Sequence, residues 1–176
     1  MQFEFAILLW LVERHQPYLD TFMKAVTSLG NAGWFWIALG IGLLCFKKTR
    51  KTGFGMLLTL AVGFLLGNVV LKNVVARQRP CWLMPEIPLL IPVPSDYSFP
   101  SGHTLASVEG AVMLYIHHKK WGIAACVLAV LIAFSRMYLF VHFPTDILGG
   151  ALLGIFNVWL VSQKIQPFLE KKWRKV

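Results

Sequence analysis

Long apolar stretches, separated by short polar or basic segments, run through most of the chain. Backbone groups in lipid must bond internally, and a run of roughly 20 apolar residues matches the bilayer thickness, so we predict membrane-spanning helices. Five are expected: Ala32–Phe46, Gly53–Val75, Ser101–Ile116, Trp121–Leu139 and Pro144–Val161. The pattern therefore predicts an all-α polytopic transmembrane helix bundle, formed as a single domain by residues 1–176.

The first 30 residues hold two shorter apolar segments. Phe5–Val12 is too short to span a bilayer, whereas Tyr18–Leu29 repeats its apolar side chains with a helical period. We predict two amphipathic helices at or partly within the membrane interface. A sixth, short membrane helix at the N-terminus remains an alternative.

Composition excludes an ordinary soluble domain. Hydrophobic residues make up 57% of the chain and charged residues only 14%, against about a quarter in soluble domains. The formal net charge of +9 would suit a nucleic-acid-binding protein, but the basic residues cluster between the apolar stretches, as in cytoplasmic loops. Membrane lipids, and not nucleic acid, are the expected partners.

The distribution of Lys and Arg predicts the orientation of the bundle. Eleven lie on one side, namely Lys47, Lys48, Arg50, Lys51, Lys119, Lys120, Lys164, Lys171, Lys172, Arg174 and Lys175. Six lie on the other side, namely Arg14, Lys24, Lys72, Arg77, Arg79 and Arg136. Because positive charge favours the cytoplasmic side, the C-terminus is expected in the cytoplasm.

Three polar segments fall at the membrane face opposite those eleven charges. Lys72–Pro80 lies at the exit of the second predicted span, and Phe99–His103 opens the third. Ser135–Asp146 covers the exit of the fourth span and the start of the fifth. Segments far apart in sequence are therefore expected to share one depth in the membrane.

The residue types in these segments predict a phosphate site. Lys72, Arg79 and Arg136 bring three cations to a membrane boundary, where charge is costly and usually functional. Ser101 and Gly102 stand at a predicted helix start, where free N–H groups and the helix dipole attract anions.

Two histidines and one carboxylate add chemistry to this predicted site. Asp146 follows His142 by four residues, one helical turn, and so is placed to orient its ring. His103 follows the helix start and is placed to protonate a leaving oxygen. Arg77 lies outside this pattern, and we expect it to be an interfacial cation with no part in the chemistry.

The three segments resemble the signature of the type-2 phosphatidic acid phosphatase (PAP2) superfamily: K-x6-R-P, then P-S-G-H, then S-R-x5-H-x3-D. Every specified position is filled here, by Lys72, Arg79, Pro80, Pro100, Ser101, Gly102, His103, Ser135, Arg136, His142 and Asp146. The resemblance spans residues 72–146. The chain is similar in length and layout to the compact bacterial members of the superfamily.

This resemblance implies a mechanism without metal or cofactor. His142 would attack phosphorus and form a phosphohistidine, Asp146 would orient it, and His103 would act as the general acid. The phosphate oxygens would be bound by Lys72, Arg79, Ser101, Gly102 and Arg136. The compact bacterial members lie in the cytoplasmic (inner) membrane, and the active site is expected to face outside.

The substrate is left open by the sequence. Hydrolysis of undecaprenyl diphosphate to the monophosphate is the expected reaction, and a phosphatidylglycerophosphate or phosphatidate phosphatase is the alternative. A membrane protein that binds phosphate without turnover is a remote alternative. The sequence does not determine the oligomeric state. Glu109, an acid within a predicted span, is expected to bond a polar partner on a neighbouring helix.

Overall fold

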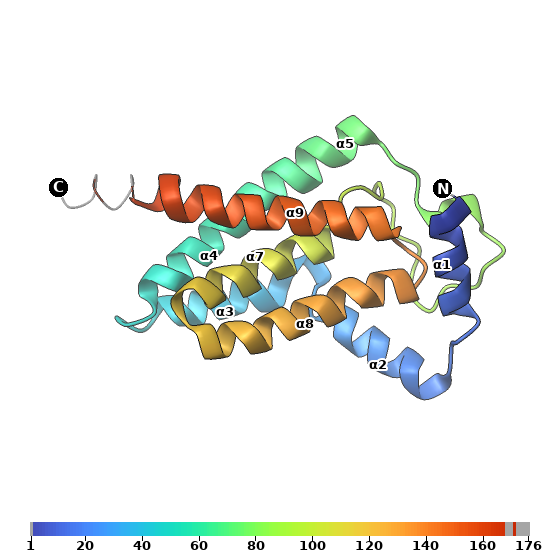
Figure 1. The fold of residues 1–176 in the computed structure, drawn as a ribbon, viewed down its shortest axis with the longest axis horizontal. Helices are drawn as coiled ribbons and strands as arrows, with labels where there is room; N and C mark the ends of the chain where they lie inside the picture. Colours follow the sequence, from blue (N-terminus) through green and yellow to red (C-terminus); the bar gives the residue numbers. More distant parts are fainter. Residues whose placement is uncertain (1, 168–170, 172–176) are drawn as a thin grey trace.

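The computed structural model describes residues 2–167 and 171, and every regular element in this part of the chain is helical. The longer helices run side by side as a bundle (Figure 1). In chain order the elements are α1 (Gln2–Val12), α2 (Pro17–Ser28), η1 (Asn31–Gly33), α3 (Trp34–Leu44), α4 (Arg50–Gly63), η2 (Phe64–Leu71), α5 (Lys72–Val75), α6 (Pro80–Leu83), α7 (Gly102–His117), α8 (Lys119–Tyr138), α9 (Pro144–Leu160) and η3 (Val161–Ile165). The prediction of an all-α membrane bundle is confirmed.

Three helical runs in the described residues are long and apolar enough to cross a membrane: Arg50–Leu83, Lys119–Tyr138 and Pro144–Ile165. They correspond to the second, fourth and fifth predicted spans. The first predicted span is half of a bent pair, in which Pro17–Ser28 and Asn31–Leu44 meet at 42°. The bend follows Gly30 and includes Gly33, whose φ of +67° is accessible to glycine at little cost.

The third predicted span, α7, is shorter than the three runs that are long enough to cross a membrane. Its 16 residues reach roughly 24 Å, less than the roughly 30 Å of a hydrocarbon core. It nevertheless lies at the centre of the bundle and packs against α8, α9 and α4. Since neighbouring helices surround it, α7 can carry polar side chains that bond to those helices instead of facing lipid.

Two of these polar contacts hold α7 in place. The indole Nε1 of Trp36, on α3, donates to Ser107 Oγ at 3.1 Å. Asn157 Nδ2, on α9, donates to Glu109 Oε1 at 2.8 Å, and both side chains are buried. The predicted role of Glu109, a hydrogen bond to a neighbouring helix, agrees with this contact.

One end of the bundle is covered by the N-terminal helices. Figure 1 shows α1 lying across the ends of the longer helices instead of along them. Leu8 of α1 packs into a buried cluster with Tyr138, the last residue of α8, and with Phe140 and Phe143, from the connection between α8 and α9. Both N-terminal segments are thus helical, as predicted, and α1 crosses the end where an interfacial helix is expected.

The segment after the second span contains a break and a short helix. The run Arg50–Leu83 is interrupted where Ala76 takes a left-handed conformation (φ 47°), after the π-helical stretch η2. Beyond this break, Pro80–Leu83 form a short helix with Pro80 in its first turn. Proline's fixed φ suits a helix start. The predicted cytoplasmic residues Lys172, Arg174 and Lys175 lie outside the described residues.

Candidate active site

The three motif segments meet at the end of the bundle that α1 covers, and they enclose one end of a cavity of about 670 Å³. The polar part of the cavity is lined by Lys72, Arg79, Asp96, Gly102, His103, Arg136 and His142. The remainder is mostly apolar and is lined by residues that include Ile37, Leu57, Leu60, Ala61 and Phe64, together with the polar residues Asn68 and Glu109. Leu57 precedes Lys72 by roughly 20 Å of helix, so the cavity runs from the polar end toward the bundle interior.

His142 lies buried in the connection between α8 and α9. Its Nε2 is 3.1 Å from Arg79 Nη1, and its Nδ1 is 3.5 Å from Asp146 Oδ2. Because a guanidinium can only donate, Nε2 accepts and the ring proton belongs on Nδ1, toward Asp146. The lone pair of Nε2 therefore points to the cation-lined end of the cavity.

Burial sets the protonation state of this histidine. Desolvation, followed by the charges of Arg79, Arg136 and Lys72, holds the pKa of His142 well below its ordinary value of 6.5. Both effects disfavour the charged ring. His142 is therefore neutral at neutral pH, the form in which an imidazole is a nucleophile.

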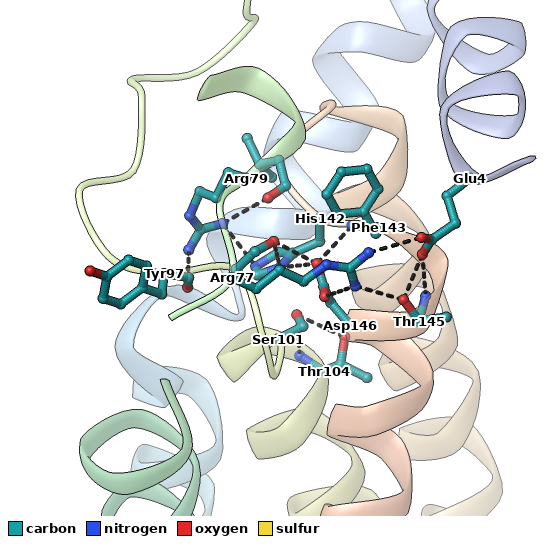
Figure 2. Close-up of polar contacts among 12 residues, drawn as sticks. Glu4, Arg77, Arg79, Tyr97, Ser101, Thr104, His142, Phe143, Thr145 and Asp146 are labelled. Carbon is teal, nitrogen blue, oxygen red and sulfur yellow. Dashed lines mark hydrogen bonds and ion pairs between the residues drawn. The ribbon is translucent and has the colours of Figure 1, made fainter. Parts of the chain in front are cut away.

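Asp146 is fully buried and both of its oxygens are bonded (Figure 2). Oδ2 accepts from the Phe143 N–H at 2.8 Å and from Ser98 Oγ at 2.5 Å. Oδ1 accepts from Arg77 Nη1 at 2.6 Å. The first of these bonds caps α9 at its start, so the fold of the helix and the orientation of the carboxylate depend on each other.

Arg79 and Lys72 share one carboxylate. Arg79 Nη2 bonds Asp96 Oδ1 at 2.7 Å, its Nε bonds the Asp96 carbonyl at 2.6 Å, and Lys72 Nζ bonds Asp96 Oδ2. Burial alone would raise the pKa of Asp96, but the hydrogen bonds and charges of Lys72 and Arg79 outweigh it and lower that pKa to about 2. Asp96 is thus an anion held where the predicted phosphate would bind.

Arg136, the third cation, is 3% exposed and lines the same cavity. Its Nη1 donates to Thr27 Oγ1, on α2, at 2.7 Å. Its Nε has no hydrogen-bond partner within the described residues. A buried guanidinium with an unused donor is a strong reason to expect an anionic ligand in the cavity.

Ser101 and Gly102 start α7, but only Gly102 is among the described residues that line the cavity. Ser101 Oγ caps the helix through the Thr104 N–H at 3.4 Å, and the Ser101 N–H donates to the Asp146 carbonyl at 3.1 Å. Its predicted phosphate contact stays a prediction. A Cβ on Gly102 would come within 2.7 Å of Asn68 Oδ1, so a side chain there would collide.

His103 is held by the connection between α2 and α3. Its Nε2 lies 3.0 Å from Asn31 Oδ1, and its ring packs so closely on Gly30 that a Cβ there would be 2.6 Å from Cδ2. The ring borders the cavity that His142 also lines, although the two histidines lie 39 positions apart.

Several residues of the site were not predicted from the sequence. Asp96 and Ser98 lie in the loop directly before Phe99–His103, and this proximity is the only signal that marks them. Arg77 was expected to be an interfacial cation without a role in the chemistry, but it bonds Asp146 directly. Glu4, which bonds Arg77, carries no signal because it lies 73 positions away.

In the part of the chain that the structure describes, no three His, Cys, Asp or Glu side chains are grouped as metal ligands. The sequence-based expectation of chemistry without metal or cofactor stays a prediction.

Comparison with known proteins identifies one family. The family model described as the PAP2 superfamily matches residues 51–169. The chain is 42% identical over 146 residues to an undecaprenyl-diphosphatase of Sulfolobus acidocaldarius, covering 82% of this chain and 70% of that protein.

Two solved structures have the same architecture. A transmembrane PAP2-type phosphatidylglycerolphosphate phosphatase of Bacillus subtilis superimposes with a TM-score of 0.74 at 37% identity, covering 94% of this chain and 84% of that one. LpxE of Aquifex aeolicus superimposes with a TM-score of 0.79 at 27% identity, covering 92% and 95%.

Proposed function

The chain belongs to the PAP2 superfamily of phosphatases, and from this premise we propose that it removes the terminal phosphate from a polyprenyl diphosphate, such as undecaprenyl diphosphate. One observation carries the proposal. A buried, neutral His142 directs Nε2 toward the cation-lined end of a cavity whose other end is mostly apolar. The polar end suits a phosphate, and the apolar part suits the hydrocarbon chain attached to it.

The first chemical step transfers the phosphoryl group to the protein. Arg79 Nη1 turns from His142 Nε2 to the bound phosphate, which frees the Nε2 lone pair. This lone pair attacks phosphorus, the bond from phosphorus to the bridging oxygen breaks, and the electron pair of that bond stays on the oxygen. His103, in its protonated form, donates a proton to the leaving oxygen. Lys72, Arg79 and Arg136 stabilise the charge on the other phosphate oxygens, and Asp146 stabilises the positive ring.

The second step returns the protein to its starting state. Water attacks the phosphorus of the phosphohistidine and loses a proton to His103, now acting as a base. The bond from phosphorus to Nε2 breaks, its electron pair returns to the ring, and inorganic phosphate leaves. Asp96 shares Lys72 and Arg79 with the phosphate in this cycle or moves aside for it.

The choice of lipid rests on the relatives. The likeness to an undecaprenyl-diphosphatase favours a polyprenyl diphosphate, with the active site on the extracytoplasmic face of a bacterial cytoplasmic membrane and the C-terminus in the cytoplasm. The second candidate is a phosphatidylglycerophosphate or phosphatidate phosphatase, favoured by the structural likeness to the Bacillus subtilis enzyme.

The test is phosphate release from purified protein in detergent with EDTA present. The substrates are undecaprenyl diphosphate, farnesyl diphosphate, phosphatidylglycerophosphate and phosphatidate. We expect turnover by the wild type and a loss of at least about a thousandfold in kcat for His142→Ala, because the nucleophile is removed. His117→Ala, an exposed histidine at the far end of α7, is the matched control.

The outcomes separate the candidates. The lipid with the highest kcat/KM decides between the polyprenyl and glycerophospholipid functions. Equal phosphate release from wild type and His142→Ala would contradict the phosphohistidine mechanism. No release from any lipid would instead favour a protein that only binds phosphate.

A further inference from the structure

Arg77 connects the carboxylate of the site to the N-terminal helix. Its Nη1 donates to Asp146 Oδ1 and to Thr145 Oγ1, each at 2.6 Å, and its Nη2 donates to Glu4 Oε2, on α1, at 2.8 Å (Figure 2). Each bond joins charged or polar groups at short distance, the class of hydrogen bond that contributes most. The guanidinium is therefore fixed on both sides.

This network lies largely out of solvent. The side chains of Glu4, Arg77 and Asp146 are 13%, 22% and 0% exposed. Glu4 also accepts from Thr145 Oγ1 at 2.5 Å, through its other oxygen. Charge pairs at this degree of burial are screened far less than pairs on an open surface.

Aromatic contacts with Phe143 hold α1 and Arg77 next to each other. Cζ of Arg77 lies 4.2 Å above the ring of Phe143, the residue between His142 and the start of α9. The ring of Phe5, next to Glu4, packs edge to face against the Phe143 ring, with 5.2 Å between the two ring centroids. The docking of α1 and the placement of Arg77 thus depend on the same few side chains.

We propose that Arg77, held by Glu4 of α1, is a positioning residue that fixes Asp146 so that its Oδ2 faces His142. The inference rests on the proposed phosphohistidine mechanism and deepens it, because it makes α1 part of the support of the nucleophile. In the described chain Arg77 is not among the residues that line the cavity, so it acts through Asp146 and not on the phosphate.

Loss of Arg77 has two physical consequences. The Asp146 carboxylate loses the bond that fixes Oδ1 and is then held through Oδ2 alone, by the Phe143 N–H and Ser98 Oγ, which loosens the alignment with His142 Nδ1. Its negative charge also loses its nearest cation and acts more strongly on the imidazole, which favours the protonated ring. A protonated His142 cannot attack phosphorus.

The acid limb of kcat/KM reports this second effect, because it follows protonation in the free enzyme. The titratable and charged groups around His142 are Lys72, Arg77, Arg79, Asp96, His103, Arg136 and Asp146. Arg77→Gln removes one cation from this set and leaves the others in place. The pKa of His142 therefore rises, and the acid limb of kcat/KM moves to higher pH.

The experiment compares Arg77→Gln, Arg77→Lys and Glu4→Gln with the wild type, on the best substrate and over a pH series. We expect Arg77→Gln to lower kcat by about tenfold to a hundredfold, to change KM by less than about twofold, and to raise the acid limb by about half a pH unit or more. Arg77→Lys keeps the charge and recovers part of kcat. Glu4→Gln lowers kcat by about threefold.

A double variant and a matched control complete the design. Glu4→Gln combined with Arg77→Gln is expected to be no slower than Arg77→Gln alone, because Glu4 acts only through Arg77. Glu13→Gln removes a carboxylate just beyond the end of α1 that is 75% exposed, and it is expected to match the wild type.

The inference is overturned if Arg77→Gln keeps the wild-type kcat and acid limb, or if it loses folded protein with no change in the acid limb of what remains. A wild type without turnover would be a different result, since it contradicts the proposed function itself.

Discussion

Charged side chains at the active-site end form two groups with different surroundings. Lys72, Arg79, Arg136 and Asp96 line the polar end of the cavity, where the three cations outnumber the Asp96 carboxylate and leave excess positive charge for a phosphate. Glu4, Arg77 and Asp146 form the second group, which lies behind His142 and has one cation between two carboxylates. We infer that the first group binds the phosphate and that the second holds the nucleophile.

The first group gives a prediction for Asp96. Asp96→Asn removes the anion that Lys72 and Arg79 now share, and both cations become available to a phosphate. We expect inorganic phosphate to inhibit this variant about threefold to tenfold more tightly than the wild type, because one charge pair at a half-exposed site contributes about 1 kcal/mol. The measurement is the inhibition constant for phosphate at pH 7, where a carboxyl with a pKa of about 2 is ionised.

Glu86→Gln, a neutral change at an exposed position on the same loop, is the control for Asp96→Asn. An unchanged phosphate inhibition constant in Asp96→Asn would mean that Asp96 does not compete with phosphate.

Among the elements, α7 combines a short length with a central position. It starts with the motif residues Ser101–His103, and it is surrounded by other helices for most of its length. Small residues permit this packing: Gly154 of α9 lies against α7 so closely that a Cβ would be 3.1 Å from the Leu105 carbonyl. The helix that positions His103 is therefore held by contacts along most of its length.

The buried bond between α7 and α9 gives a prediction of stability. Asn157→Ala leaves the Glu109 side chain without the partner that bonds it at 2.8 Å. An unsatisfied buried polar group costs about 1–3 kcal/mol, so we expect a lower unfolding temperature in detergent, with turnover per folded molecule retained. Ser162→Ala removes an exposed hydroxyl bond on the following turn and is the control. Equal unfolding temperatures for the two variants would show that the bond does not stabilise the bundle.

At the scale of the whole molecule, the site and the basic connections lie at opposite ends. The motif segments and α1 lie at one end of the long helices, and the α3–α4 and α7–α8 connections lie at the other (Figure 1). Lys47 and Lys48 belong to the α3–α4 connection, and Lys119 and Lys120 begin α8 directly after the α7–α8 connection. By the positive-inside rule, we predict that the site faces away from the cytoplasm.

This orientation is tested with a thiol reagent that does not cross membranes. Cys45, which is exposed at the basic end, is expected to stay unlabelled in intact cells and to react after lysis. Glu86→Cys, on the loop at the site end, is expected to react in intact cells. The opposite labelling pattern would place the site in the cytoplasm and would contradict the proposed extracytoplasmic active site.

Much of the fold follows from local sequence. The ends of α7, α8 and α9 differ from the predicted spans by two residues or fewer, because Ser101 caps α7 and Pro144 opens α9. The bend between α2 and α3 and the short helix at Pro80 were not predicted. They depend on single turns of backbone, which apolar periodicity does not report.

The candidate site likewise contains residues that the sequence predicts and residues that it does not. The residues of the three motifs are recognisable in the sequence because fixed spacing and residue type express the chemistry of a phosphate site. Their approach to one another follows from helices that cross the bilayer and return. Asp96 and the Glu4–Arg77 pair have no such signature, because their roles arise from contacts across 17 to 73 positions.

The sequence by itself determined the class of this protein: a helical membrane bundle with phosphatase motifs at one face. It did so because the bilayer requires long apolar helices and phosphate chemistry requires particular side chains at fixed spacing. Only the tertiary structure decided which partner each charge takes. Asp96 lies between Lys72 and Arg79, and Glu4 brings α1 against Arg77 and Asp146. Such pairings depend on how buried side chains share a limited space, and no local pattern encodes that.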